Sequence, residues 1–105
     1  MLVERYGSTV YGHPGEPDGP PTIAIKFQDG PVGDLGCNGC GVEDVIAVLL
    51  DQLDDLNRTL PCPENAHAVQ ALLAAVEWLA RRTVLRQAQG VEGTNLPHYQ
   101  TPSSA

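Results

Sequence analysis

Three cysteines and one histidine are the first residues in this sequence whose types and spacing could carry chemistry. Cys37 and Cys40 form a CxxC pair, and Cys62 and His67 follow downstream. Such ligands are typical of structural zinc sites, and a CxxC pair at a helix start is typical of redox dithiols. A third interpretation makes the cysteines small apolar core side chains beside an Asn-Gly turn. We favour the turn, because Cys62 and His67 open an expected helix and no parallel-sheet pattern is present; a small zinc-stabilised or structural interaction module remains the alternative function.

A cluster of arginines is the second chemical feature. Arg81, Arg82 and Arg86 supply half of the six basic residues in a chain with thirteen acidic residues and a formal charge of −7. An acidic chain lacks the broad basic face that nucleic-acid polymers require, so the cluster favours a small, enclosed anion instead. The other interpretation is that these arginines only complement a helix dipole.

No arrangement typical of catalysis accompanies these groups. His13 and His98 lie in expected loose termini, and no phosphate-loop or nucleophile pattern occurs, so we predict neither an enzyme nor a cofactor. No apolar run is long enough to span a bilayer and no hydrophobic leader follows Met1. Together with an odd number of cysteines, this predicts a soluble protein of a reducing cytoplasm with no membrane partner.

Two kinds of element are expected to position these residues. Residues 1–21, broken by Gly and Pro, predict an irregular segment, and residues 96–105 predict a loose tail. The alternation in 22–28, the DGP turn and the segment 32–38 predict an antiparallel β-hairpin. From Val42 an apolar stripe of helical period continues to "NRTLPCP", and a second helix is predicted from Pro63 to about Gln89. The fold class is therefore α+β, with residues 22–95 as one domain made of a β-hairpin and an antiparallel αα-hairpin.

The second helix would be roughly 40 Å long. A small ribbon and two helices cannot enclose apolar stripes of that length, and chains of this size often bury the remainder against other copies. We therefore expect a homo-oligomer.

Two stretches resemble a known family. They are "IAIKFQDGPVGDLGCNGCGVEDVIAVLLDQL" (23–53) and "CPENAHAVQALLAAVEWLARRTVLRQAQGVEGT" (62–94). The ordered pattern is FQ-x-GP, G-x-NG with an acidic helix start, C-x-EN-x-A, RT-x-x-R and GVEGT. It resembles the phage sponge family that joins Thoeris anti-defence protein one and anti-CBASS protein two, nearer the Thoeris branch.

This resemblance implies a hexamer that binds cyclic nucleotide-type immune signals without cleaving them, and so blocks bacterial Thoeris or CBASS defence in the host cytoplasm. The implied ligands are glycocyclic ADP-ribose isomers, with cyclic di- or trinucleotides at separate sites in some members. Arg82 and Arg86 match the pair expected to hold the phosphates, and Asn65 matches the residue expected at the base or ribose. Leu56 lies where relatives often carry an aromatic that stacks on adenine. Further candidates are Thr83, Gly90, Thr94 and Lys26, although Gly90 also fits a helix cap and Lys26 an exposed edge strand.

The spacing of these candidates has a geometric consequence. Asn65 and Arg82 are 17 residues apart on one expected helix, which is roughly 25 Å at helical rise. If both residues bind one small ligand, the pocket must join the start of one helix to the end of another chain's helix.

Overall fold

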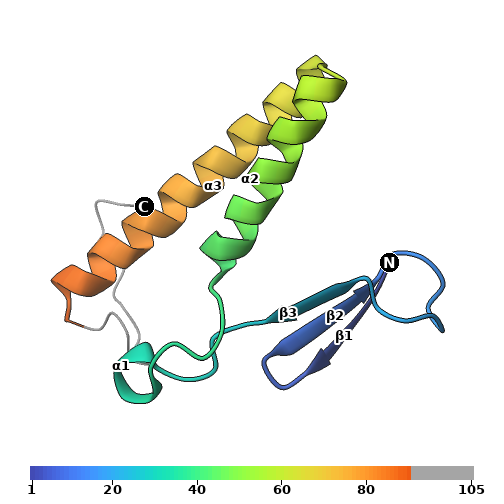
Figure 1. The fold of residues 1–105 in the computed structure, drawn as a ribbon. Helices are drawn as coiled ribbons and strands as arrows, with labels where there is room; N and C mark the ends of the chain where they lie inside the picture. Colours follow the sequence, from blue (N-terminus) through green and yellow to red (C-terminus); the bar gives the residue numbers. More distant parts are fainter. Residues whose placement is uncertain (91–105) are drawn as a thin grey trace. The chain divides into compact units, whose positions relative to one another are not determined.

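The computed structural model describes residues 1–90 of the 105-residue chain, so the expected tail at 96–105 lies outside the described part. By contacts, the chain forms two compact units, Met1–Gly41 and a second that begins at Val42. The first holds three strands and a short helix, and the second holds two long helices, which confirms the α+β class (Figure 1). The boundary falls inside the range 22–95, for which a single domain stays a prediction.

The first unit is built on a three-stranded antiparallel sheet in the order β1-β2-β3. The strands are β1 (Leu2–Tyr6), β2 (Thr9–His13) and β3 (Ile23–Lys26). The expectation of an irregular segment over 1–21 is therefore wrong for residues 2–13. A two-residue connection joins β1 to β2, with Gly7 at φ 61°, and such tight turns favour a hairpin.

The partner of β3 also differs from expectation. β3 pairs with β2, with Val10 opposite Ile25, and the segment 32–38 is not a strand. Instead, Val32–Leu35 forms the short helix α1 after Pro31, and Gly36 ends it at φ 72°. The positive φ of Gly36 interrupts extended backbone, so 32–38 cannot align along β3 as a regular strand.

A buried histidine on β2 contacts both the loop that follows this strand and the neighbouring strand β1. His13 is 7% exposed, and its Nδ1 lies 3.0 Å from the Gly19 carbonyl oxygen. Its Nε2 lies 3.0 Å from Oε1 of Glu4 on the neighbouring strand. The other oxygen of Glu4 accepts a 2.7 Å hydrogen bond from the Tyr6 hydroxyl. This bond, together with the negative charge of Glu4, raises the pKa of Tyr6 above its ordinary value.

The second unit is the predicted αα-hairpin. Helix α2 (Val42–Thr59) and helix α3 (Pro63–Ala88) contact each other and run in opposite directions. Pro63 occupies the first turn of α3, where its missing N–H is not needed. Gln89 follows α3 and Gly90 adopts φ 71°, as predicted for the end of this helix.

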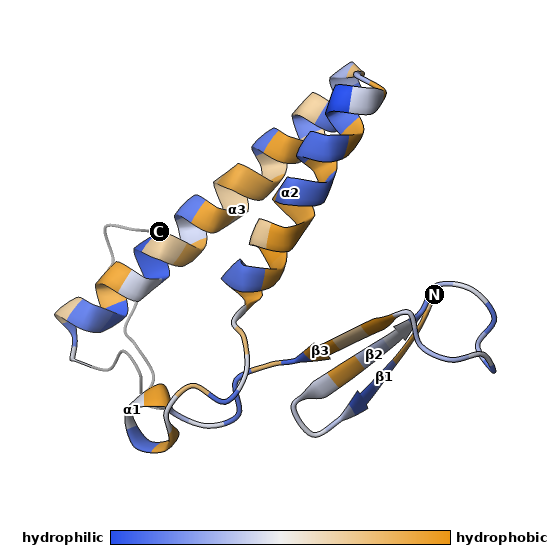
Figure 2. Cartoon of the chain, in the orientation of Figure 1, coloured by the Kyte–Doolittle hydropathy of each residue, from blue (hydrophilic) through white to orange (hydrophobic). Residues whose placement is uncertain are grey.

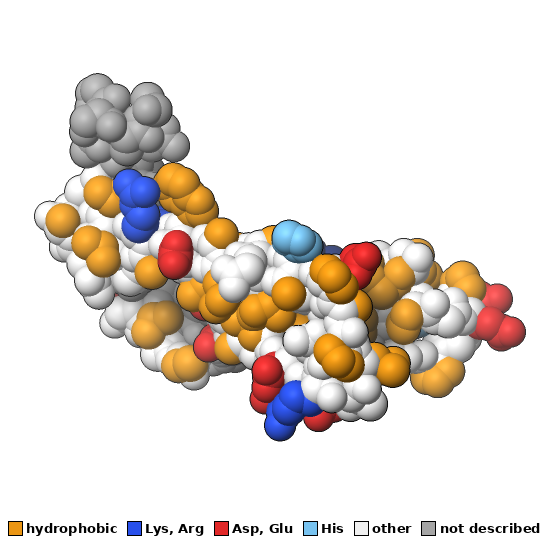
Figure 3. Space-filling model, turned by 90° about the horizontal axis from the view of Figure 1, so that it is seen from above, with side chains coloured by type: hydrophobic (Ala, Val, Ile, Leu, Met, Phe, Trp, Pro, Cys, Tyr) orange, Lys and Arg blue, Asp and Glu red, His pale blue; other side chains and the backbone are white. Residues whose placement is uncertain are grey.

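The described chain buries almost no hydrophobic core. Ile46, at 8% exposure, is the one hydrophobic side chain within residues 1–90 that is buried, and α3 buries none of its residues. Hydrophobic positions nevertheless run along both long helices (Figure 2), and many hydrophobic side chains lie on the face drawn in Figure 3. The described chain therefore leaves apolar helix surface exposed, as expected for two long helices and a small sheet.

Candidate arginine site on the helical hairpin

The arginine cluster lies in the last turns of α3, beside the start of α2. The Arg82 guanidinium donates from Nη2 to Oε1 of Glu43 over 2.9 Å. About half of the Arg82 side chain stays exposed. Arg86 lies one helical turn further along α3 and is half-buried. Residues at i and i+4 share a helix face, so two guanidinium groups reach the same side of this end of the hairpin.

The third arginine has a different role. The Arg81 guanidinium carbon lies 4.7 Å from the centre of the Trp78 ring, in a cation–π contact. Trp78 is itself 65% exposed. The arginines of the cluster therefore have different partners: Arg81 stacks on an aromatic ring and Arg82 pairs with a carboxylate.

Asn65 and Leu56 lie at the other end of the hairpin. The Asn65 side-chain amide donates to the Leu60 carbonyl over 3.2 Å, and the Cys62 N–H donates to Oδ1 of Asn57 over 3.3 Å. These bonds fix the connection between α2 and α3. Leu56, near the end of α2, is 43% exposed. Within one chain, the structure places Asn65 and Leu56 at the opposite end of the hairpin from Arg82 and Arg86.

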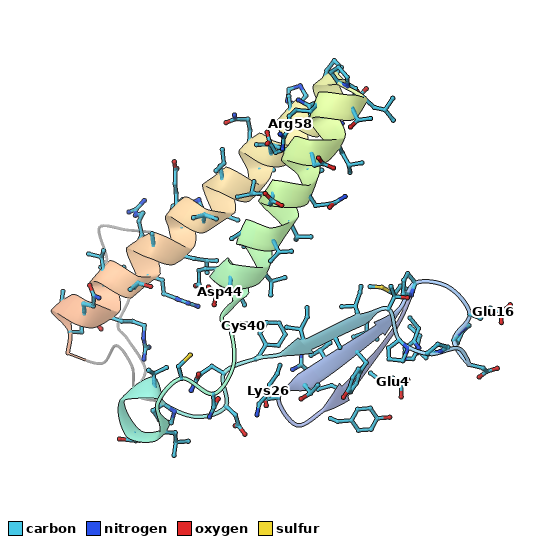
Figure 4. All side chains as sticks on the ribbon, viewed as in Figure 1. Glu4, Glu16, Lys26, Cys40, Asp44 and Arg58 are labelled. Carbon is cyan, nitrogen blue, oxygen red and sulfur yellow. The ribbon has the colours of Figure 1, made fainter. Side chains whose placement is uncertain are left out.

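The remaining candidates have local contacts. The Thr83 hydroxyl donates to the Leu79 carbonyl one turn earlier, over 3.2 Å. The Gly90 N–H donates to the Gln87 carbonyl over 3.1 Å, so this N–H caps the C-terminal end of α3. Lys26 is exposed at the end of β3, an edge strand of the sheet (Figure 4). Thr94 lies outside the described residues.

The candidate metal ligands make other contacts. All three cysteines are free thiols, and Cys37 is exposed, with Sγ 3.3 Å from the Gly39 carbonyl. The expectation that Cys37 is a core side chain is therefore wrong, whereas Cys40 is half-buried. Cys62 precedes the first turn of α3, and His67 is exposed on that helix. Among the residues that the structure describes, no three His, Cys, Asp or Glu side chains are grouped to hold a metal ion.

The motif residues Gln28 and Asn38 form a clasp that the sequence alone did not predict. Asn38 receives a 2.8 Å hydrogen bond from the Asp29 N–H and donates one of 2.8 Å to the Asp29 carbonyl. The Asn38 N–H donates to the Gln28 side-chain oxygen over 2.9 Å. The Gln28 amide nitrogen donates in turn to the Gly36 carbonyl over 2.8 Å. We call these side-chain bonds the Gln28–Asn38 clasp; they join FQ-x-GP to G-x-NG.

Backbone contacts complete the clasp. Phe27 and Cys40 form a parallel bridge, in which the Cys40 N–H donates to the Lys26 carbonyl and the Gln28 N–H to the Cys40 carbonyl, each over 2.9 Å. A Cβ on Gly39 would lie 2.8 Å from the Gln28 nitrogen and closer still to the Phe27 carbonyl. Gly39 does not have a positive φ, so its backbone conformation is open to other residues. Glycine is required here because the neighbouring backbone leaves no room for a Cβ.

The described residues thus form an α+β chain with a motif clasp in the first unit and an arginine-bearing helical hairpin in the second. The family model for the Acb2/Tad1 hairpin domain matches residues 19–84. The chain is also 43% identical, over 72 residues, to "Thoeris anti-defense 1" of Bacillus phage SBSphiJ7. That match covers 68% of this chain and 51% of the relative, so the chain spans about half the length of that protein. The chain belongs to the Acb2/Tad1 hairpin-domain family, near its Thoeris branch.

Proposed function

We propose that this chain is a non-catalytic anti-defence sponge that binds a small cyclic nucleotide-type immune signal and lowers its free concentration in the host cytoplasm. The observation that supports this function most directly is the Arg82 and Arg86 pair at an accessible helix end. A guanidinium can hold phosphate oxygens through two parallel hydrogen bonds. Membership of the Acb2/Tad1 hairpin family supports the anti-defence role.

The proposed ligands are glycocyclic ADP-ribose isomers, by similarity to the Thoeris branch. Cyclic di- or trinucleotides are the second ligand class, at a separate site. Both classes carry phosphates within a compact ring, which suits two neighbouring arginines better than a polymer would. With a formal charge of −7, the chain as a whole repels long polyanions, so selectivity depends on local arginines.

The proposed pocket is shared between copies of the chain in a homo-oligomer, a hexamer by the family resemblance. One chain holds the two groups of candidates at opposite ends of α3, roughly 25 Å apart. A second copy can bring its Arg82 and Arg86 to the Asn65 end of the first. The shortage of buried apolar residues in the single chain supports the same assembly.

The experiment that tests the sponge function separates binding from cleavage. The protein is incubated with purified glycocyclic ADP-ribose and filtered, and free ligand is measured by liquid chromatography. The retained protein is then denatured by heat and the released ligand is measured. We expect depletion followed by return of intact ligand. Return of a cleaved product would show an enzyme, and no depletion would contradict both activities.

A further inference from the structure

The segment that closes the Gln28–Asn38 clasp contains an asparagine whose side chain can react with its own backbone. Asn38 is followed by Gly39, and this is the one Asn-Gly pair in the sequence. Because Gly39 has no Cβ, no side chain shields its backbone nitrogen. That nitrogen can lose its proton and attack Cγ of Asn38: a nitrogen–carbon bond forms, the bond from Cγ to Nδ2 breaks, and ammonia leaves. Water then opens the resulting succinimide ring to aspartate or isoaspartate.

The folded clasp opposes this reaction at both reacting groups. The Asn38 amide is held on each side, because its Oδ1 accepts from the Asp29 N–H and its Nδ2 donates to the Asp29 carbonyl, each over 2.8 Å. The Gly39 backbone packs so closely against the Phe27 carbonyl that no Cβ fits between them. The next residue, Cys40, is fixed by its parallel bridge to Phe27. A rotation that brings the Gly39 nitrogen onto the Asn38 side chain therefore has to break these contacts.

The product of the reaction cannot rebuild the same contacts. An ionised carboxyl group only accepts hydrogen bonds, so an acid at position 38 has no donor for the Asp29 carbonyl that Nδ2 satisfies in the intact chain. The acid also adds a second acidic side chain beside Asp29. Isoaspartate brings a further change, because it lengthens the main chain by one methylene group between the N–H that donates to Gln28 and the bridge residue Cys40. Loss of one amide group therefore removes the bonds on which the clasp depends.

We propose that Asn38 is a site of spontaneous deamidation, that the Gln28–Asn38 clasp protects it in the folded chain, and that the completed reaction opens the clasp irreversibly. Deamidation then starts from molecules in which this segment is locally open, so its rate follows the population of that open state. The inference rests on contacts within the first unit and holds whether or not the chain binds a nucleotide-type signal.

Incubation of the whole chain with and without guanidinium chloride measures the protection. Samples are kept in weakly alkaline buffer, and peptide mass spectrometry locates each deamidated residue. We expect Asn38 to react roughly tenfold or more faster in guanidinium than in native buffer. Asn57 and Asn65 are the internal controls, because each is followed by a residue with a side chain and should stay intact while Asn38 reacts. Equal rates in the two buffers would overturn the protection, and an unreacted Asn38 in guanidinium would overturn the site itself.

Gln28→Ala tests whether the clasp gives the protection. This variant removes the side chain that accepts from the Asn38 N–H and donates to the Gly36 carbonyl, and it leaves the Asn-Gly pair unchanged. We expect Asn38 to deamidate several-fold faster in this variant than in wild type, both in native buffer. The matched control is Gln52→Ala, which truncates an exposed glutamine of α2 and should react at the wild-type rate. A wild-type rate for Gln28→Ala would overturn the role of the clasp.

Hydrogen exchange on the deamidated wild-type protein needs no variant that folds. The deamidated form is separated by ion exchange, returned to native buffer and compared with fresh protein by nuclear magnetic resonance. The amides of Asp29 and Cys40 bond within the clasp and the bridge, so both should exchange several-fold faster after deamidation. The amides of α3 are the control and should be unchanged. Unchanged exchange at Asp29 and Cys40 would overturn the irreversible opening.

Discussion

At the scale of single residues, the Arg82 guanidinium is paired with the Glu43 carboxylate. An ion pair this exposed contributes about 0–1 kcal/mol, because water and salt screen it. The phosphate of the proposed ligand can therefore replace the Glu43 carboxylate as the partner of Arg82 at a small free-energy cost. Glu43 thus pairs with Arg82 without blocking the proposed phosphate contact.

Replacement of Arg86 tests the proposed phosphate contact. We expect Arg86→Ala to weaken binding of glycocyclic ADP-ribose roughly 10- to 100-fold, because a charge-assisted hydrogen bond contributes about 1.5–3 kcal/mol. Isothermal titration measures the dissociation constant, and light scattering verifies that the assembly is unchanged.

The matched control is Arg81→Ala, which removes an equal charge five residues earlier on α3. Because Arg81 stacks on Trp78, we expect its loss to change affinity less than threefold. An Arg86→Ala protein that assembles normally and binds as tightly as wild type would contradict the arginine assignment.

The cysteines are predicted to be dispensable. A Cys37→Ala, Cys40→Ala double variant should assemble and deplete the ligand as wild type does, because Cys37 is exposed and the contacts of Cys40 in the bridge are made by its backbone. Light scattering and the depletion assay measure both properties, and elemental analysis of wild type measures bound zinc. Loss of both properties in the variant, with zinc present in wild type, would restore the metal interpretation.

At the scale of elements, the Gln28–Asn38 clasp replaces a regular strand with side-chain hydrogen bonds. The side chains of Gln28 and Asn38 bond to backbone groups that no sheet partner satisfies, and so hold the two segments together where a regular ladder is absent. The motif residues Gln28 and Asn38 are therefore needed to form the structure of this segment. Their presence does not by itself indicate a ligand contact.

Gly39 gives a direct test of the clasp. Gly39→Ala should lower the free energy of unfolding of the first unit by about 1–3 kcal/mol, because its Cβ would overlap the Phe27 carbonyl and force the bridge apart. Denaturant unfolding followed by circular dichroism measures this change. The control is Gly15→Ala, where a Cβ meets no atom within 4 Å and the expected change is within about 0.5 kcal/mol. Equal stability of the two variants would contradict the close-approach argument.

The elements differed in how far the sequence could predict them. Both long helices were predicted to within a residue or two, because apolar period, Pro63 and Gly90 all agree locally. The strand pairing was not, because the choice between residues 2–13 and 32–38 as partner for β3 depends on contacts distant in sequence. The clasp was missed for the same reason, since its hydrogen bonds join residues 8 to 10 positions apart.

At the scale of the whole molecule, the candidate residues named from the sequence stay a prediction, and within the described chain they do not form one pocket. The structure places Arg82 beside Glu43 and Asn65 beside Leu60, at opposite ends of the helical hairpin. No change within a single hairpin short of breaking α3 can bring the two groups together. A pocket that contains both therefore requires a second copy.

The small buried core predicts that stability depends on protein concentration. If copies cover one another's hydrophobic residues, the midpoint of thermal unfolding should rise as protomer concentration increases, because association stabilises the folded state by mass action. Scanning calorimetry over a hundredfold concentration range measures this dependence. A midpoint independent of concentration would contradict the homo-oligomer, and a lysozyme sample serves as the monomeric control.

The stacked pair of Trp78 and Arg81 also has a practical consequence. Trp78 is the chain's only tryptophan, and it lies exposed one helical turn from Arg82. The indole emission of the unlabelled protein therefore originates from a single known position beside the arginine pair. Fluorescence from this native reporter can therefore test in real time whether the proposed ligand binds at that end of the hairpin.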